Sequence, residues 1–374
     1  MGSILIPTVE DDFIIALPRP FHLATGEALQ PLKLRYALYG RLNRERDNAI
    51  LVCHALSGSA RVGDWWPEMF GPGGSFDTER YCVIGINVIG SCNGSTGPSS
   101  SNPVTGKPYG KQFPLISVSD MVRGQAELLD FLGVTRLHAV VGGSIGGMQA
   151  LQWALDFPER VGSCVAVGAS PLSALGLALN HLQRQAIRND PLWLNGDYQP
   201  DNQPVAGLAL ARALAVCSYK SPGLLAQRFA REPDRSGEDP SASMGGRYDV
   251  AGYLDYQGQN FTRRFDANSY LVLSKAMDTF DLTRGYSSET QAFRRIQARV
   301  LLVGISSDWL FPATDILALS ERMQRAGVQA SYRELRSAHG HDGFLADAKV
   351  LARLIAPHLV AQSTAPLDSL VAVG

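Results

Sequence analysis

The sequence feature that most constrains this chain is a serine set among glycines, between an apolar run and a helical segment. The mostly apolar residues 137–141 lead into Gly142-Gly143-Ser144-Ile145-Gly146-Gly147, and residues 150–155 have the spacing of a helix. A serine on so tight a turn has strained backbone geometry, so its neighbours must be small. In this context Gly-x-Ser-x-Gly predicts a nucleophile elbow that raises the Ser144 hydroxyl above a sheet. Taken alone, the pattern also fits a glycine-rich turn with an incidental serine.

Apolar runs on both sides of the elbow predict an α/β fold with a mostly parallel, doubly wound sheet. Strands are expected at 49–54, 81–87, 137–141, 164–168, 299–305 and 330–335, with an antiparallel edge strand at 32–40. Helices are expected at 118–132, 150–155, 314–326 and 343–359, and this alternation of strands and helices is typical of a parallel sheet.

The alternation of strands and helices is interrupted in the second half of the chain. Residues 173–292 contain helical segments at 174–187, 207–216 and 267–279 and no strand of the core type. The sequence therefore predicts a first part of the core at 1–172, a helical lid insertion at 173–292 and a second part of the core at 293–374. We expect the lid to lie over the carboxyl edge of the sheet.

Composition argues against several classes of function. The 374 residues have a formal net charge of −1 and no block of like charge, so no nucleic-acid partner is expected. No stretch has the roughly 18–20 uninterrupted apolar residues of a membrane span, and residues 1–7 lack the features of a signal peptide. We expect a cytoplasmic protein without a metal site, whose cysteines are reduced and mostly buried: Cys53, Cys82, Cys92, Cys164 and Cys217.

An aspartate and a histidine lie beyond two other predicted strands. Asp308 follows the strand at 299–305, and His341 follows the strand at 330–335. The carboxyl ends of parallel strands meet at one edge of a sheet, so Ser144, Asp308 and His341 can converge there. Their chain order is that of the α/β-hydrolase triad, in which His341 would take the proton of Ser144 and Asp308 would orient the imidazole. Alone, Asp308 could be a turn or cap residue and His341 a surface histidine.

The other parts of such a site can also be placed on the sequence. His339 is the alternative base, but we favour His341 because a predicted helix begins just beyond it. The oxyanion hole is expected from two backbone N–H groups, those of Ile145 and of Leu56 in the loop after the His54 strand. His54 is expected to position that loop.

Five segments of the chain resemble the homoserine O-acetyltransferases of methionine biosynthesis: 51–60, 93–100, 142–149, 265–270 and 340–344. The resemblance spans almost the whole chain. It implies an α/β-hydrolase fold and a ping-pong acyl transfer through Ser144, with acetyl-CoA as donor substrate, L-homoserine as acceptor and no cofactor. It also implies a homodimer formed through the lid helices.

The same resemblance implies that Arg212 and Asp342 bind the charged ends of the amino acid, which suits a zwitterion. Arg212 could instead be a solvated arginine on its helix. Family members that use succinyl-CoA tend to carry an arginine two residues after the triad aspartate, where this chain has Leu310. We therefore favour acetyl over succinyl. Serine as the acceptor stays open, because one methylene is worth only about 1–3 kcal/mol.

Two other functions share these features. A serine esterase would use the same triad with water as the acceptor, and a closed site would favour transfer instead. A binding protein could retain the scaffold without catalysis, since fold does not dictate function. Such proteins commonly lose a member of the triad, whereas this chain has all three residues.

Overall fold

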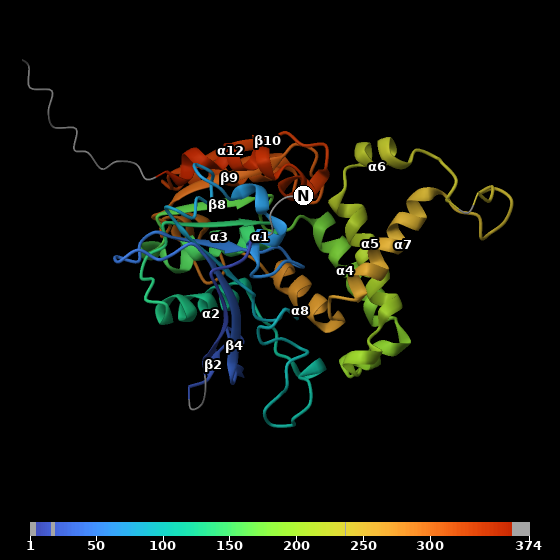
Figure 1. Ribbon diagram of the computed structural model, residues 1–374, viewed down its shortest axis with the longest axis horizontal. Coiled ribbons are helices and arrows are strands. Elements are labelled where there is room, and N and C mark those ends of the chain that lie inside the picture. Colours follow the sequence, from blue (N-terminus) through green and yellow to red (C-terminus); the bar gives the residue numbers. More distant parts are fainter. Residues whose placement is uncertain (1–4, 16–18, 236, 361–374) are drawn as a thin grey trace, which may run out of the picture.

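The computed structural model describes residues 5–15, 19–235 and 237–360. Its centre is an eight-stranded sheet in the order β1-β4-β6-β5-β7-β8-β9-β10 (Figure 1). These strands are β1 (Val9–Ile15), β4 (Leu32–Tyr39), β5 (Ala49–Cys53), β6 (Cys82–Ile86), β7 (Ala139–Gly143), β8 (Ser163–Val167), β9 (Arg299–Ile305) and β10 (Ala330–Leu335). The six neighbouring strands β6, β5, β7, β8, β9 and β10 are parallel to one another. This confirms the predicted mostly parallel sheet.

Helices cover both faces of the sheet. Every residue of its central strands β5, β7 and β8 is therefore buried. Alternate residues of a strand point to opposite faces, so Val140 belongs to one apolar cluster and Val141 to the other. The first cluster includes residues of α2 (Val118–Phe131), α3 (Ile145–Asp156) and α10 (Ala313–Arg325), and the second includes residues of α12 (Ala348–Leu359). This arrangement is the doubly wound one that the sequence predicts.

The prediction that residues 32–40 form an edge strand is wrong. Strand β4 pairs antiparallel with β6 on one side and with β1 on the other, so β1 is the edge. Acidic residues interrupt the apolar pattern of β1, and two bases on β4 compensate their charge. Asp12 accepts from Arg35 at 2.6 Å and lies 3.5 Å from the ammonium of Lys33. Because these ion pairs join strands distant in sequence, the local pattern could not show β1 as a strand.

The closing helix, predicted as one element at 343–359, is divided. A short turn η6 (Gly340–Asp342) and α11 (Gly343–Ala346) precede α12. Asp347 separates α11 from α12 with φ −106° and ψ 34°. The apolar spacing continues through the break, because Phe344, Leu351 and Ile355 are all buried. Hydrophobic periodicity therefore could not locate the interruption.

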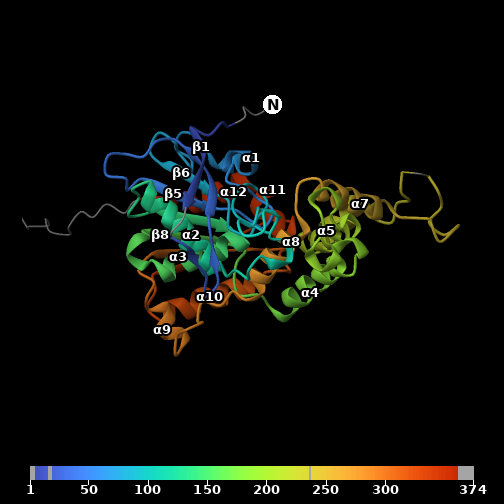
Figure 2. The same ribbon diagram turned by 90° about the horizontal axis from the view of Figure 1, so that it is seen from below.

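Between β8 and β9 the described residues form only helices and loops. The helices are α4 (Ala174–Arg188), α5 (Val205–Tyr219), α6 (Pro222–Phe229), α7 (Asp249–Thr262), α8 (Ala267–Asp278) and α9 (Glu289–Phe293). Figures 1 and 2 show α4, α5 and α7 grouped beside the sheet, with α8 between this group and the sheet. The helices predicted at 174–187, 207–216 and 267–279 are confirmed, whereas the domain boundaries at 172 and 292 stay predictions. Helix α9 contacts the core helix α10 through Arg322 and Glu289 at 3.1 Å.

Shorter elements complete the described part of the chain: β2 (Phe21–His22), β3 (Ala28–Leu29), α1 (Val62–Trp65), η1 (Pro67–Met69), η2 (Gly110–Gln112), η3 (Pro158–Arg160), η4 (Pro191–Gly196) and η5 (Pro200–Asn202). None of the helices in the described ranges combines the length and the apolar character needed to cross a membrane. All five cysteines are free. Residues 1–4 and 361–374, which belong to the expected N-terminus and to the predicted second part of the core, lie outside the described residues.

Candidate active site

Ser144 lies on the turn between β7 and α3, where the sequence predicts the elbow. Its backbone has φ 58° and ψ −129°, a left-handed conformation that is strained for a residue other than glycine. The Ser144 N–H donates to the Val167 carbonyl of the neighbouring strand at 2.9 Å. This bond ties the strained turn to the sheet.

Two glycines allow the chain to close around Ser144. A Cβ atom on Gly142 would lie 2.2 Å from the Gly146 carbonyl oxygen, and one on Gly146 would lie 2.1 Å from the Cys53 carbonyl oxygen. Both obstacles are backbone atoms that cannot rotate away. The Gly-x-Ser-x-Gly pattern is therefore a steric requirement of this turn.

His341 and Asp308 form a buried pair at the carboxyl edge of the sheet. The imidazole Nδ1 is 2.6 Å from Asp308 Oδ2, and the His341 side chain is 3% exposed. Asp308 Oδ1 accepts the N–H groups of Leu310 and Phe311, each at 2.9 Å. With Nδ1 donating to Asp308, Nε2 remains as the basic nitrogen, and within the described ranges this buried atom has no hydrogen-bond partner. His341 lines the same cavity as Ser144.

Aromatic rings hold the imidazole in place. Phe311 stacks on it with ring centroids 5.1 Å apart, and Phe344 meets it edge-on at 5.6 Å. Tyr219 lies on a third side at 5.8 Å. These rings restrict rotation of the imidazole and exclude water from it, which favours one orientation for proton transfer.

Opposing effects act on the pKa of His341. Burial lowers this pKa, but the charge and hydrogen bond of Asp308 together with the charge of Asp342 outweigh burial and raise it above the usual 6.5. A base must be neutral to accept a proton, so the reactive form of His341 is lost as the pH falls through its pKa.

We therefore expect kcat/KM for cleavage of a chromogenic acetyl ester to fall on the acid side with a midpoint above pH 6.5. In Asp342→Asn the midpoint should move to lower pH. The negative charge of Asp342 stabilises the imidazolium, and the variant loses this stabilisation. The pH profiles of the two proteins test this expectation. A midpoint below 6.5, or an unchanged midpoint in the variant, would contradict it.

The predicted oxyanion-hole residues flank the serine. Leu56 lines the cavity, and Ile145 begins α3 directly after Ser144. Neither backbone N–H donates to another group in the described part of the chain. His54 supports the loop of Leu56: its Nδ1 lies 2.7 Å from the Ala55 carbonyl and its Nε2 accepts the Val88 N–H at 3.1 Å. Burial lowers the pKa of His54 to about 4, so the ring is neutral and positions the loop, as expected.

Charged groups and Ser144 line one cavity of about 470 Å³. Arg212 lies with its guanidinium carbon 4.9 Å from the Phe261 ring centroid, and Arg264 lies 5.2 Å from the same centroid. Arg264 also donates to the Ser57 carbonyl at 3.2 Å. Asp342 directly follows His341 in η6 and lines the same cavity. The structure thus brings the predicted Arg212 and Asp342 into one cavity with Ser144.

Three residues at this site are not part of any pattern recognised in the sequence. Tyr219 and Arg264 line the cavity, whereas Lys220 lies outside its lining. Arg264 directly precedes a segment on which the family resemblance depends, so that segment was the available signal. Lys220 reaches the site by an ion pair with Asp342, Nζ to Oδ2 at 2.8 Å. No sequence signal predicts a contact between residues so distant along the chain.

Two sequence candidates lie outside the cavity. The Leu310 side chain is buried in the apolar core, and its backbone N–H bonds to Asp308. Leu310 is not among the residues that line the cavity, so the expectation that its side chain selects the acyl group lacks a direct contact. The backbone of His339 donates to Ser337 Oγ at 3.0 Å, and its side chain does not line the cavity either. Contact with Asp308 therefore favours His341 over His339 as the base.

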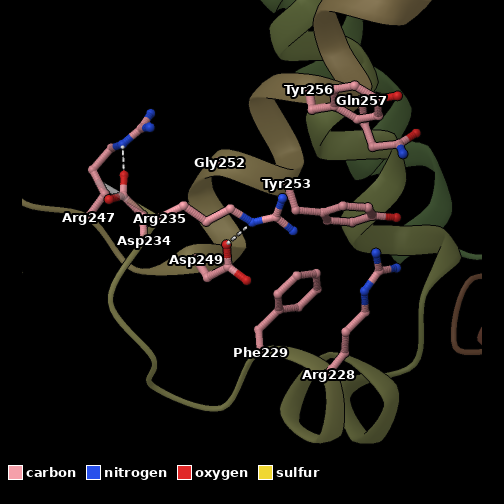
Figure 3. A pocket seen from close by; sticks show the side chains of 10 residues that line it. All are labelled: Arg228, Phe229, Asp234, Arg235, Arg247, Asp249, Gly252, Tyr253, Tyr256 and Gln257. Atoms are coloured by element: carbon pink, nitrogen blue, oxygen red, sulfur yellow. Dashed lines mark hydrogen bonds and ion pairs between the residues drawn. The ribbon is translucent and has the colours of Figure 1, made fainter. Parts of the chain in front are cut away.

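A second cavity, of about 660 Å³, lies between α6 and α7 (Figure 3). Ion pairs link charged groups on its walls: Arg247 with Asp234 at 3.0 Å and Arg235 with Asp249 at 4.0 Å. Among the described residues that line it there is no serine, cysteine or histidine. In the described ranges no group of three or more His, Cys, Asp or Glu could hold a metal ion. Ser144 and the buried His341 line the other cavity.

Comparison with known proteins shows the fold family and the named relatives of this chain. The family model for the alpha/beta hydrolase fold matches residues 48–347. A homoserine O-acetyltransferase of Symbiobacterium thermophilum is 48% identical over 345 residues, which are 89% of this chain and 90% of that protein. A homoserine O-acetyltransferase of Geotalea uraniireducens is 43% identical over 354 residues, with 92% and 95% covered.

Solved structures include both transferases and esterases. The homoserine O-acetyltransferase of Bacillus anthracis superposes with a TM-score of 0.88 at 29% identity, covering 95% of this chain and 98% of that one. Esterase E22 superposes with a TM-score of 0.85 at 26% identity, covering 94% and 100%. The same architecture is therefore found in proteins named for two reactions.

Proposed function

The chain belongs to the homoserine O-acetyltransferase family of the α/β-hydrolase fold, and from this premise we propose that it transfers an acetyl group from acetyl-CoA to the hydroxyl of L-homoserine. The observation that carries the proposal is one cavity that is lined by Ser144, His341, Arg212 and Asp342. It combines an acyl-transfer centre with opposite charges suited to an amino acid. The proposed reaction needs no cofactor and no metal.

In the first half-reaction Ser144 Oγ attacks the thioester carbonyl, and His341 Nε2 takes the proton of the serine hydroxyl. The backbone N–H groups of Leu56 and Ile145 stabilise the oxyanion of the tetrahedral intermediate. The carbon–sulfur bond then breaks, and His341 returns the proton to the sulfur of CoA. An acetyl ester on Ser144 remains. Asp308 supports both transfers by stabilising the imidazolium and its tautomer.

In the second half-reaction homoserine replaces CoA in the cavity. Its hydroxyl loses a proton to His341 Nε2 and attacks the ester carbonyl. The bond from the carbonyl carbon to Ser144 Oγ breaks, and His341 gives the proton back to the serine. We propose that Arg212 holds the substrate carboxylate and Asp342 its ammonium, which aligns the hydroxyl with the acyl-enzyme.

A serine esterase is the second candidate, because esterase E22 has the same fold at 26% identity. The charged pair of Arg212 and Asp342 favours the transferase, since a plain ester does not need both charges. Succinyl-CoA as donor and serine as acceptor are finer alternatives within the same mechanism. The relatives at 43–48% identity are named acetyltransferases, which supports acetyl.

A thiol-release assay tests the proposal by crossing acetyl-CoA and succinyl-CoA with L-homoserine and L-serine. We expect CoA release to require an amino acid and to be fastest with acetyl-CoA and homoserine. Succinyl-CoA or serine as the preferred substrate would change the assignment of donor or acceptor. Release that does not depend on an amino acid, together with ester hydrolysis, would reject the transferase in favour of the esterase.

We also propose a cytoplasmic homodimer that acts in methionine biosynthesis, as the family resemblance implies. Exposed leucines on α4 and α5 support the contact: Leu175 is 48% exposed, Leu182 53% and Leu210 54%. Exposed apolar side chains on lid helices are compatible with a surface that another protein covers. Light scattering of the purified protein measures the oligomeric state.

A further inference from the structure

The end of α5 is attached to both loops that carry the acid and the base of the triad. Trp309, next to Asp308, donates its indole N–H to the Lys220 carbonyl at 3.0 Å. Ser221 Oγ donates to the Ala338 carbonyl at 2.5 Å. Gly340 approaches so closely that a Cβ there would lie 2.6 Å from the Tyr219 carbonyl oxygen. These contacts place Lys220 at the edge of the active site independently of its side chain.

The Lys220 ammonium is paired with the carboxylate that is proposed to bind the substrate ammonium. Lys220 Nζ lies 2.8 Å from Asp342 Oδ2, and the two side chains are only 19% and 25% exposed. An alkylammonium with three donors is the same chemical group that an amino acid presents at its α-carbon. The carboxylate proposed to bind the substrate ammonium is therefore already paired with an ammonium from this chain.

The charge balance at the cavity depends on whether Lys220 is paired with Asp342. Arg212 and Arg264 lie over the Phe261 ring, and neither contacts a carboxylate within the described ranges. With Lys220 on Asp342, the arginine charges are not offset by that carboxylate, so the cavity attracts a polyanion such as CoA. Without Lys220, the unpaired Asp342 would repel the donor.

We propose that Lys220 is a stand-in for the substrate ammonium and thereby a positioning and specificity residue of the ping-pong cycle. It neutralises Asp342 while acetyl-CoA acylates Ser144, and it yields Asp342 to the ammonium of homoserine in the second half-reaction. The inference rests on the proposed function. Its physical basis is that a half-buried carboxylate is costly unpaired, whereas exchanging one ammonium for another retains the ion pair.

The test is Lys220→Met in steady-state kinetics, because in a ping-pong cycle each kcat/KM reports only its own half-reaction. We expect kcat/KM for acetyl-CoA to fall by about three- to tenfold, since a positive charge is lost. We expect kcat/KM for homoserine to rise by a similar factor, since its ammonium no longer competes with Lys220. Lys220→Arg should restore the value for acetyl-CoA.

Lys111→Met is the matched control. It removes a lysine that pairs with Asp197 at 3.1 Å outside the active-site cavity, and both kcat/KM values should stay unchanged. Thermal unfolding checks that the variants fold. Should Lys220→Met not fold, Lys220→Gln, which removes the charge and keeps a donor, replaces it with the same expected opposite changes.

Three results would overturn the inference. Equal losses in both half-reactions would mean that Lys220 only supports the structure. A loss confined to homoserine would mean that Lys220 helps Asp342 to bind the ammonium instead of yielding to it. No change in either kcat/KM value would mean that Lys220 has no role in the cycle. If the unaltered protein releases no CoA with homoserine, the proposed function itself fails, and the inference fails with it for a distinguishable reason.

Discussion

Ser144→Ala is expected to abolish amino-acid-dependent CoA release, with a fall in turnover of about 10³- to 10⁶-fold. Alanine leaves no oxygen to attack the thioester, whereas the oxyanion-hole N–H groups and the charged walls of the cavity remain. Residual turnover would then come from binding and oxyanion stabilisation alone. The measurement is thiol release, combined with mass spectrometry of the protein after incubation with acetyl-CoA, in which only the unaltered enzyme should carry an acetyl group.

Ser163→Ala is the control for this variant. Ser163 is buried as Ser144 is, but it begins β8 at the opposite end of the strands and donates to the His358 carbonyl at 3.3 Å. We expect the control to acetylate normally. Acetylation of Ser144→Ala at the same rate as the unaltered protein would disprove the covalent role of Ser144.

Asp308→Asn is expected to lower kcat by about 10³- to 10⁴-fold while the fold is retained. The reason lies in the two N–H groups of Leu310 and Phe311, which both donate to Oδ1. In the variant they hold the carboxamide oxygen at that position, so its NH₂ group faces His341 Nδ1. The imidazole must then accept at Nδ1 and carry its proton on Nε2, which is the wrong tautomer for taking a proton from Ser144.

The rate of CoA release at saturating substrates measures this effect, and thermal unfolding monitors the fold. Asp315→Asn serves as the control because Asp315 is an exposed carboxylate in the first turn of the neighbouring helix α10. We expect the control to retain its kcat. A loss of less than about tenfold in Asp308→Asn would show that the orientation of His341 does not depend on this carboxylate.

The parallel part of the sheet was predictable because its strands are buried on both faces and read as continuous apolar runs. The edge strand β1 was not, because Glu10, Asp11 and Asp12 interrupt its apolar pattern. Its charge is compensated only by bases of β4, which local propensity does not include. The break at Asp347 was hidden for a related reason, since buried residues continue on both sides of it.

By itself the sequence determined the elbow and the order of the three residues associated with it. Gly142 and Gly146 are required by contacts within a few residues of Ser144 and with the adjacent strand, so their spacing is a local steric signature. Asp308 and His341 follow strands whose ends must meet at one edge. Each of these inferences depends on short-range geometry or on a general rule of parallel sheets.

Which charged groups meet at the active site could be seen from the tertiary structure alone. Arg212 lies in the middle of α5, Lys220 directly follows that helix, Arg264 follows α7, and Asp342 follows β10. The Lys220–Asp342 ion pair forms because the end of α5 packs against the turn at Gly340. Coulomb attraction between side chains depends on their distance in space and not on their separation along the chain. No local pattern could therefore show that the carboxylate proposed for the substrate is already paired with a lysine.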